Sequence, residues 1–108
     1  MSTFCLVHGA FCDASIWDLV RLELEARGHE VVAMDLPCDD PTAGPARYAE
    51  VVDASLGERT GSLVVVGHSL AGLTIPLLAA RRPIERLVFL CAFIPQPGRT
   101  FREQFGEG

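Results

Sequence analysis

The sequence predicts an α/β fold, a parallel sheet of about four strands with helices on both faces. Two observations predict it. Short apolar runs alternate with longer stretches of helical periodicity along the 108 residues, which is the pattern of strand–helix–strand units. The run at 62–66 is almost entirely apolar, as in a strand buried on both faces. The length allows a single domain, residues 1–108.

The predicted elements follow in chain order. They are a strand at 4–7, a helix at 15–27, a strand at 30–34, a helix around 48–56, a strand at 62–66, a helix at 69–82 and a strand at 87–93. Ser15 and Asp18 resemble the capping box of the first helix. In the second helix, one face repeats at helical spacing from Tyr48 to Leu56. Pro76 lies inside the third predicted helix, so we expect a kink there.

Right-handed crossovers leave few possible strand orders. If the second strand lies outside the first and the third returns to its other side, the order is 2-1-3-4. The first and third strands then end side by side, where the chain reverses direction across the sheet. Open α/β sheets bind their ligands at such a point.

The strongest chemical signal follows the third strand. Residues 67–71, Gly-His-Ser-Leu-Ala, form a G-x-S-x-G nucleophile elbow with Ala71 in the last small position. The motif places Ser69 on a sharp turn between strand and helix. Gly67 and Ala71 have to be small because strand and helix nearly touch there. The start of the helix favours negative charge, so a developing oxyanion would be stabilised beside Ser69.

A second motif, His8-Gly9, ends the first strand. In nucleophile-elbow enzymes one oxyanion donor is the backbone N–H after the nucleophile, here Leu70, and the other comes from a loop after an earlier strand. Ala10 is the expected second donor. Phe11 and His68 are candidate substrate contacts, and we expect His68 to pack or to form a hydrogen bond at the elbow.

Charge and composition exclude several other classes. The net charge is −5, all basic residues are Arg, and they form no basic stripe, so we expect no nucleic-acid partner. No apolar run approaches the roughly 20 residues that span a bilayer, and the first residues do not read as a signal peptide. We therefore expect a cytoplasmic protein with no membrane partner. The four cysteines form no C-x-x-C pair, so buried free thiols are favoured over zinc or disulfides.

Together these segments resemble the α/β-hydrolase superfamily, in the branch of plant methyl esterases, hydroxynitrile lyases and their bacterial relatives. The segments that carry the resemblance are 6–17, 28–31, 34–37, 66–72 and 87–90. The resemblance implies Ser69 as nucleophile, Ala10 and Leu70 as main-chain oxyanion donors, and neither a metal nor an organic cofactor. It also implies a small-molecule ester as substrate.

The chain departs from the family in its acid and base. The family order is Ser, then Asp or Glu, then His, but no histidine follows Ser69. We expect His8 to order its turn rather than to take a proton. His29 precedes a strand and therefore lies at the wrong end of the sheet, as does Glu85. The tail residues Glu103 and Glu107 have no later histidine to orient.

These departures predict a partial α/β-hydrolase fold that lacks the later strands, the cap and the triad acid and base. Without a base, Ser69 is a weak nucleophile, so we expect the chain alone to be nearly inactive. The fourth strand would form an uncovered sheet edge, which favours self-association.

Two other functions remain open. A hydroxynitrile lyase-like enzyme would use the same serine without an acyl-enzyme; a Lys outside these residues usually marks that activity. A non-catalytic fragment would bind a partner or ligand. Relatives that open halides or epoxides normally carry Asp at the elbow, so Ser69 argues against them.

Overall fold

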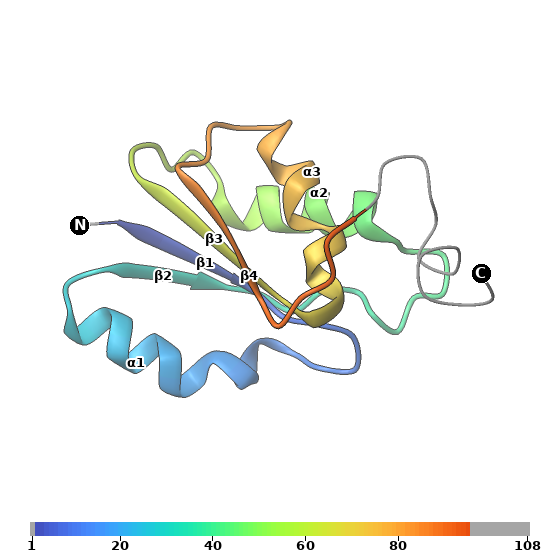
Figure 1. Ribbon diagram of the computed structural model, residues 1–108, viewed down its shortest axis with the longest axis horizontal. Coiled ribbons are helices and arrows are strands. Elements are labelled where there is room, and N and C mark those ends of the chain that lie inside the picture. The colour runs from blue at the N-terminus through green and yellow to red at the C-terminus, as the bar shows by residue number, and fades with distance from the viewer. Residues whose placement is uncertain (1, 96–108) are drawn as a thin grey trace.

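The computed structural model describes residues 2–95, which form one sheet and the helices that cover it (Figure 1). The elements are β1 (Thr3–Val7), η1 (Ala14–Trp17), α1 (Asp18–Ala26), β2 (Glu30–Ala33), α2 (Pro45–Leu56), β3 (Leu63–His68), η2 (Ser69–Leu73), α3 (Ile75–Ala79) and β4 (Arg86–Leu90). All strand pairs are parallel and the order is β2-β1-β3-β4. The predicted fold class and strand order are therefore confirmed.

The register of the two central strands sets the position of the site. β1 pairs with β3 from Thr3 opposite Leu63 to Val7 opposite Gly67. Because both strands run in the same direction, the residues that follow them meet at the same edge of the sheet. This places the segment 8–11 beside the segment 68–70, as the sequence predicted.

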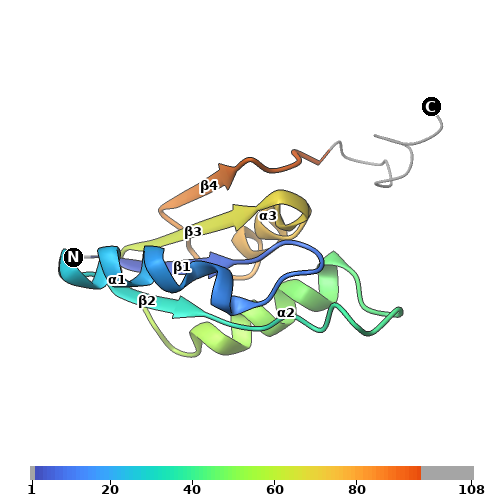
Figure 2. The same cartoon turned by 90° about the horizontal axis from the view of Figure 1, so that it is seen from below.

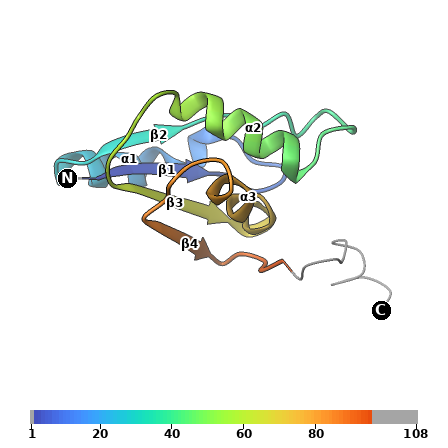
Figure 3. The same cartoon turned by 90° about the horizontal axis from the view of Figure 1, so that it is seen from above.

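Helices lie on both faces of the sheet. Figure 3 shows α2 and α3 on one face of the sheet. Figure 2 shows the other face, where α1 lies along β1 and β2 and does not extend over β4. The larger apolar core lies on the α2–α3 face and includes Val52, Leu56, Ile75 and Leu78. The smaller cluster, centred on Trp17, lies on the α1 face.

The first predicted helix begins differently from the expectation. Asp13, not Ser15, is the cap: its carboxylate accepts a hydrogen bond from the Ser15 N–H at 2.8 Å. A single 3-10 turn follows before α1 starts at Asp18. The capping-box prediction was therefore wrong, because the carboxylate of Asp13, two residues earlier, accepts from the free amide of Ser15 and begins the turn there.

The third predicted helix is also divided. η2 and α3 replace one helix over 69–82, and Pro76 lies in the first turn of α3 instead of its interior. A proline is tolerated there because its missing N–H would have no partner in the first turn. The expected kink is thus a break between two short helices. No helix within residues 2–95 is long and apolar enough to cross a membrane.

The strand β4 ends at Leu90, three residues before the predicted end. Cys91 has a φ of 47°, in the left-handed region that strands do not use. The segment after it turns across η2, where the Phe93 N–H donates to the Ser69 carbonyl at 3.1 Å. Residues 91–93 thus do not extend β4, and Phe93 instead contacts the turn at Ser69.

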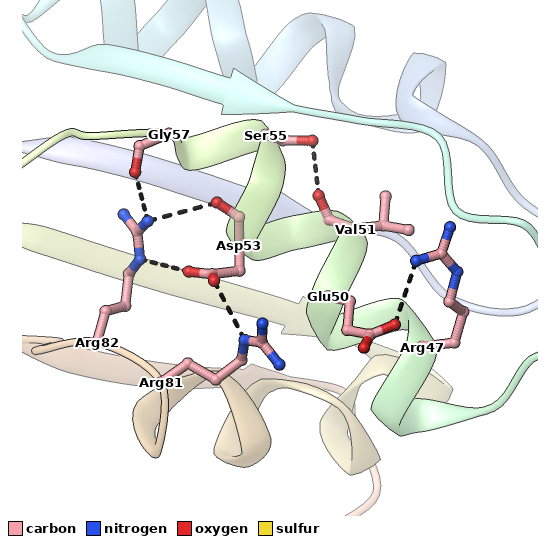
Figure 4. Close-up of polar contacts among 8 residues, drawn as sticks. All are labelled: Arg47, Glu50, Val51, Asp53, Ser55, Gly57, Arg81 and Arg82. Carbon is pink, nitrogen blue, oxygen red and sulfur yellow. Dashed lines mark hydrogen bonds and ion pairs between the residues drawn. The ribbon is translucent and has the colours of Figure 1, made fainter.

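An ion-pair cluster joins the ends of α2 and α3 (Figure 4). The Asp53 carboxylate accepts from Arg82 Nε at 2.7 Å and from Arg81 Nε at 3.1 Å. Arg82 also donates to the Gly57 carbonyl at 2.5 Å. Burial disfavours the charged form of Asp53, but the hydrogen bonds from Arg82 and Arg81 outweigh it and lower the pKa of this carboxyl. The cluster holds the C-terminal end of α3 against α2.

Candidate active site

Ser69 stands at the end of the central strand β3, where the chain turns into η2. Its φ is 58°, a left-handed conformation that costs a non-glycine residue about 1–3 kcal/mol. A residue keeps such a strained conformation only when contacts with its surroundings hold it there, and strained residues are concentrated at functional sites. The Phe93 N–H holds the Ser69 carbonyl at 3.1 Å. The geometry is that of a nucleophile elbow, as the motif predicted.

The elbow is packed so tightly that its glycines have no room for a side chain. A Cβ on Gly67 would lie 2.9 Å from the Ile75 side chain and 3.2 Å from the Ala71 carbonyl oxygen. This confirms that strand and helix nearly touch at Gly67. A Cβ on Gly72 would lie only 1.9 Å from the Phe93 carbonyl oxygen. The requirement at Gly72 was missed, because the contact comes from a distant segment that no local pattern marks.

The loop after β1 packs directly against the elbow. A Cβ on Gly9 would lie 3.0 Å from both the Ser69 Cβ and the His68 carbonyl oxygen. Gly9, Ala10 and Leu70 line one cleft. The structure therefore brings Ala10 and Leu70, the two predicted main-chain donors, to the same cleft.

His8 fixes this loop and is buried, with 1% of its surface exposed. Its Nε2 accepts a hydrogen bond from the Leu36 N–H at 3.0 Å. Since that nitrogen accepts, Nδ1 carries the proton and donates to the Gly9 carbonyl at 2.7 Å. Both ring nitrogens are thus occupied in ordering the turn, as expected for His8.

His68 points its ring toward the α1 face. It meets Trp17 edge to face, with ring centroids 6.3 Å apart. Its Nδ1 is buried, and no partner for it exists among the described residues. The expected packing role of His68 at the elbow is confirmed. Trp17, the aromatic partner, was not foreseen as part of the elbow.

The remaining candidate acids and bases lie elsewhere. His29 Nδ1 accepts from the Ser2 N–H at 3.1 Å, at the start of β1. Glu85 accepts from the Ser62 hydroxyl at 2.9 Å, at the start of β3. Both lie at the opposite end of the sheet from Ser69, as predicted. Glu103 and Glu107 lie outside the described residues.

A cleft of about 600 Å³ opens beside the predicted oxyanion donors. It lies between the segment 8–11, the loop after β2, the first turn of α2 and the segment 70–74. Leu36, Tyr48 and Leu73 give it an apolar wall, and Asp39 lies on its lining. We call it the β1–α2 cleft. Its residues come from four segments that are distant in the sequence, so it could not be foreseen from motifs.

Phe11 is one of the residues that line the β1–α2 cleft. Its backbone is left-handed, with a φ of 61°, and its side chain is fully exposed. A positive φ is uncommon for a bulky residue such as phenylalanine. The position agrees with the expectation that Phe11 contacts substrate, which stays a prediction.

Two other titratable side chains near the sheet are poor nucleophiles. Burial raises the pKa of the Cys5 thiol to about 12, in spite of Arg82 and Arg59. Burial and the neighbouring Cys38 also raise the pKa of the Tyr48 phenol. Within residues 2–95, no cluster of three or more His, Cys, Asp or Glu side chains is placed to hold a metal ion.

Comparison with known proteins agrees with this geometry. The model of the alpha/beta hydrolase family matches residues 6–107. The chain is 35% identical over 106 residues to a pyrethroid hydrolase of Sphingobium wenxiniae, covering 88% of this chain and 37% of that protein. It is 36% identical over 104 residues to the alpha-hydroxynitrile lyase of Arabidopsis thaliana, covering 85% and 40%.

Solved structures share the fold. The crystal structure of polyneuridine aldehyde esterase superposes with a TM-score of 0.82 at 29% identity, covering 97% of this chain and 46% of that one. The chain thus spans about two fifths of the length of its curated relatives. The sheet described above corresponds to part of the relatives' fold.

Proposed function

This chain belongs to the alpha/beta hydrolase family, and we propose that it carries the nucleophile and oxyanion hole of a carboxylic-ester hydrolase. One observation carries the proposal. Ser69 is held in a left-handed conformation at the end of the central strand, with Gly9 packed against its Cβ. A serine in this conformation exposes its hydroxyl at the edge of the sheet, next to two candidate backbone donors.

In the proposed reaction, the Ser69 hydroxyl oxygen attacks the ester carbonyl carbon while a base removes its proton. The carbonyl oxygen becomes negative and is stabilised by the N–H groups of Ala10 and Leu70. The alcohol then leaves with a proton, and an acyl group remains on Ser69. Water attacks this acyl-enzyme, releases the acid and restores the serine.

Within residues 2–95, none of the three histidines is placed to take that proton. His8 is occupied by two hydrogen bonds, His68 packs on Trp17, and His29 lies at the other end of the sheet. In serine hydrolases that lose triad members, the oxyanion hole and binding leave a residual acceleration of roughly 10³-fold over water. We therefore propose that this chain alone hydrolyses esters at no more than that residual level.

A fluorophosphonate probe followed by peptide mass spectrometry tests the nucleophile. We expect slow labelling confined to Ser69, which Ser69→Ala abolishes. Ser62→Ala, which changes a serine at the opposite end of β3 from the elbow, should label like the unchanged chain. Labelling that survives Ser69→Ala would rule out Ser69 as the reactive residue.

A lyase is the second candidate, because one relative at 36% identity is a hydroxynitrile lyase. The two functions differ in whether Ser69 becomes acylated. Incubation with p-nitrophenyl acetate should leave an acetyl group on the Ser69 peptide if the chain carries an esterase site. Cyanide release from a cyanohydrin, with no acetyl group on Ser69, would favour the lyase.

A further inference from the structure

On the α1 side of the sheet, only one half of the sheet is covered. The helix α1 lies along β1 and β2 and does not extend over β4 (Figure 2). Two neighbouring strands are together about 10 Å wide, which is also the diameter of one helix with its side chains. The half formed by β3 and β4 therefore has the width of one further helix, and no helix of residues 2–95 lies over β4 on this side.

The uncovered half presents apolar side chains. Successive residues of a strand point to opposite faces, and Leu87 and Phe89 pack against the core on the α2–α3 side. Val88 and Leu90 therefore point to the α1 side, where both are exposed. Val66 of β3 points the same way, since it packs against the smaller core cluster. We call the surface formed by Val66, Val88 and Leu90 the β3–β4 strip.

The outward side of α1 is apolar as well. Leu19 and Val20 are exposed, as is Ile16 one turn earlier. Leu22, four residues after Asp18, lies toward β2 and thus at the rim of this surface, since Asp18 lines a cleft beside the end of β2. One chain therefore carries an apolar helix surface and, next to it, a bare strip as wide as that helix.

These two surfaces fit a second copy of the chain. A two-fold axis parallel to the strands, above the line between β1 and β3, exchanges the covered and the bare halves of the sheet. Each α1 then lies over the β3–β4 strip of the other copy, and the two α1 helices lie side by side. Their separation is two strand spacings, roughly 10 Å, which is a usual distance between packed helices. A two-fold axis across the strands would instead place α1 on α1 and leave both strips bare.

Charge favours the same arrangement. Because α1 follows β1 and precedes the parallel strand β2, its last turn lies at the edge of the sheet where β4 begins. In that turn Glu23 is paired with Arg27 at 2.7 Å, whereas Glu25 forms no ion pair within residues 2–95. The C-terminal end of a helix also favours a cation. Arg86 begins β4, points to the α1 side by the alternation of the strand, and is likewise unpaired among the described residues. In the two-fold pair, each Arg86 faces the last turn of the other copy's α1.

We propose that the chain forms a two-fold dimer in which α1 of each copy packs on the β3–β4 strip of the other. The occupant of the strip is thus a second copy of this chain. The surface differs from the free edge of β4, because it uses side chains that point to the α1 side and not the unpaired backbone groups of the edge. The inference concerns assembly and does not depend on the proposed reaction.

Sedimentation equilibrium of the chain tests for the dimer, with an expected mass of twice 11.7 kDa. NMR spectra of a dilution series then locate the surface. Dilution should shift the amide signals of both α1 and β4 and leave those of α2 unchanged. Signals that shift in β4 but not in α1 would indicate pairing through the edge and would overturn the proposal. A chain that stays monomeric at millimolar concentration would also overturn it and would leave the strip to another occupant.

Two charged variants test the contact between the two surfaces. Leu19→Lys should weaken the dimer about tenfold or more, because symmetry buries the new charge twice. Leu90→Glu should weaken it similarly from the side of the strip. Leu77→Lys is the matched control, since Leu77 is an exposed leucine of α3 on the other side of the sheet, and it should leave the dimer unchanged. A dimer that Leu19→Lys does not weaken would contradict the role of α1.

A mixture of the two variants gives the sharpest test. Pairing a Leu19→Lys copy with a Leu90→Glu copy places the new ammonium opposite the new carboxylate at one contact and keeps both leucines at the other. The mixture should therefore form a heterodimer, although neither variant dimerises well alone. Unchanged signals from β1 and β3 would show that each variant is folded. A mixture of folded variants that stays monomeric would overturn the two-fold arrangement.

Discussion

The two faces of the sheet differ in how completely they are covered. On the α2–α3 face, Leu56, Ile75 and Leu78 are fully buried. On the α1 face, Leu19 and Leu22 are 79% and 63% exposed, and α1 buries no residue of its own. The elbow belongs to the closed face, since η2 and α3 follow Ser69 directly. The geometry of Ser69 therefore depends on the closed face, while the open face carries apolar surface that residues 2–95 do not cover.

The largest difference in unfolding free energy is expected between alanine substitutions at two leucines, Leu78 of α3 and Leu22 of α1. Leu78→Ala leaves a cavity under α3 and should lower the free energy of unfolding by about 2–5 kcal/mol. Leu22→Ala removes an exposed side chain and should change it by less than about 0.5 kcal/mol. Urea unfolding of the two variants measures the difference. Similar losses at both positions would mean that the faces are equally closed.

A second comparison concerns the packing of the elbow. Gly72→Ala places a methyl group against the Phe93 carbonyl oxygen and should cost about 1–3 kcal/mol in unfolding free energy. Gly44→Ala is the control, since a Cβ there meets nothing within 4 Å. We expect it to cost less than about 1 kcal/mol, through the weaker helix cap. A Gly72→Ala variant as stable as the unchanged chain would show that the segment 91–93 does not hold the elbow.

The ion-pair cluster of the closed face should make stability depend on pH. The pKa of Asp53 is lowered in the folded chain, so its contribution is complete above the unfolded pKa of about 3.9 and is lost as pH falls through the folded value. Asp53→Asn should cost about 1.5–3 kcal/mol at neutral pH. The difference between the two chains should shrink below about pH 4.

Glu50→Gln provides the matched control for that experiment. Glu50 pairs with Arg47 on the same helix, but half of its side chain is exposed, so the loss should be below about 0.5 kcal/mol. Chemical unfolding at several pH values measures both variants. A pH-independent difference for Asp53→Asn would contradict the assigned role of its charge.

The smallest effect on stability is expected at the β4 edge. Among the described strands, β4 pairs only with β3, and Val88 and Leu90 are 39% and 44% exposed. An uncovered apolar edge predicts self-association. Sedimentation should give a mass above 11.7 kDa, and Val88→Lys should restore the monomer. Ala54→Lys, on the exposed side of α2, adds the same charge and should not.

The sequence was sufficient for the fold and for the nucleophile because both depend on local patterns. Alternating apolar runs indicated the strands, and handedness left few possible orders, one of which is observed. The elbow motif alone predicted the sharp turn at Ser69, where the backbone has a φ of 58°. The paired ends of β1 and β3 then followed from the strand order alone.

What the sequence did not predict depends on contacts between distant segments. Gly72 is constrained by Phe93, and Asp53 binds Arg82 across two helices. The β1–α2 cleft is lined by residues from four segments that are distant in the sequence. The capping error at Ser15 was of another kind: Asp13 and Ser15 are both residue types that cap helices, and the spacing of the sequence does not decide between them.

The central claim is that Ser69 is the nucleophile and that none of the three histidines of this chain serves as its base. Imidazole added as an external base tests it directly through the rate of fluorophosphonate labelling at Ser69. We predict slow labelling without imidazole and a rate that rises in proportion to its concentration, with no labelling in Ser69→Ala. Fast labelling of Ser69 that imidazole leaves unchanged would contradict the account, because a base would then already be present in the chain.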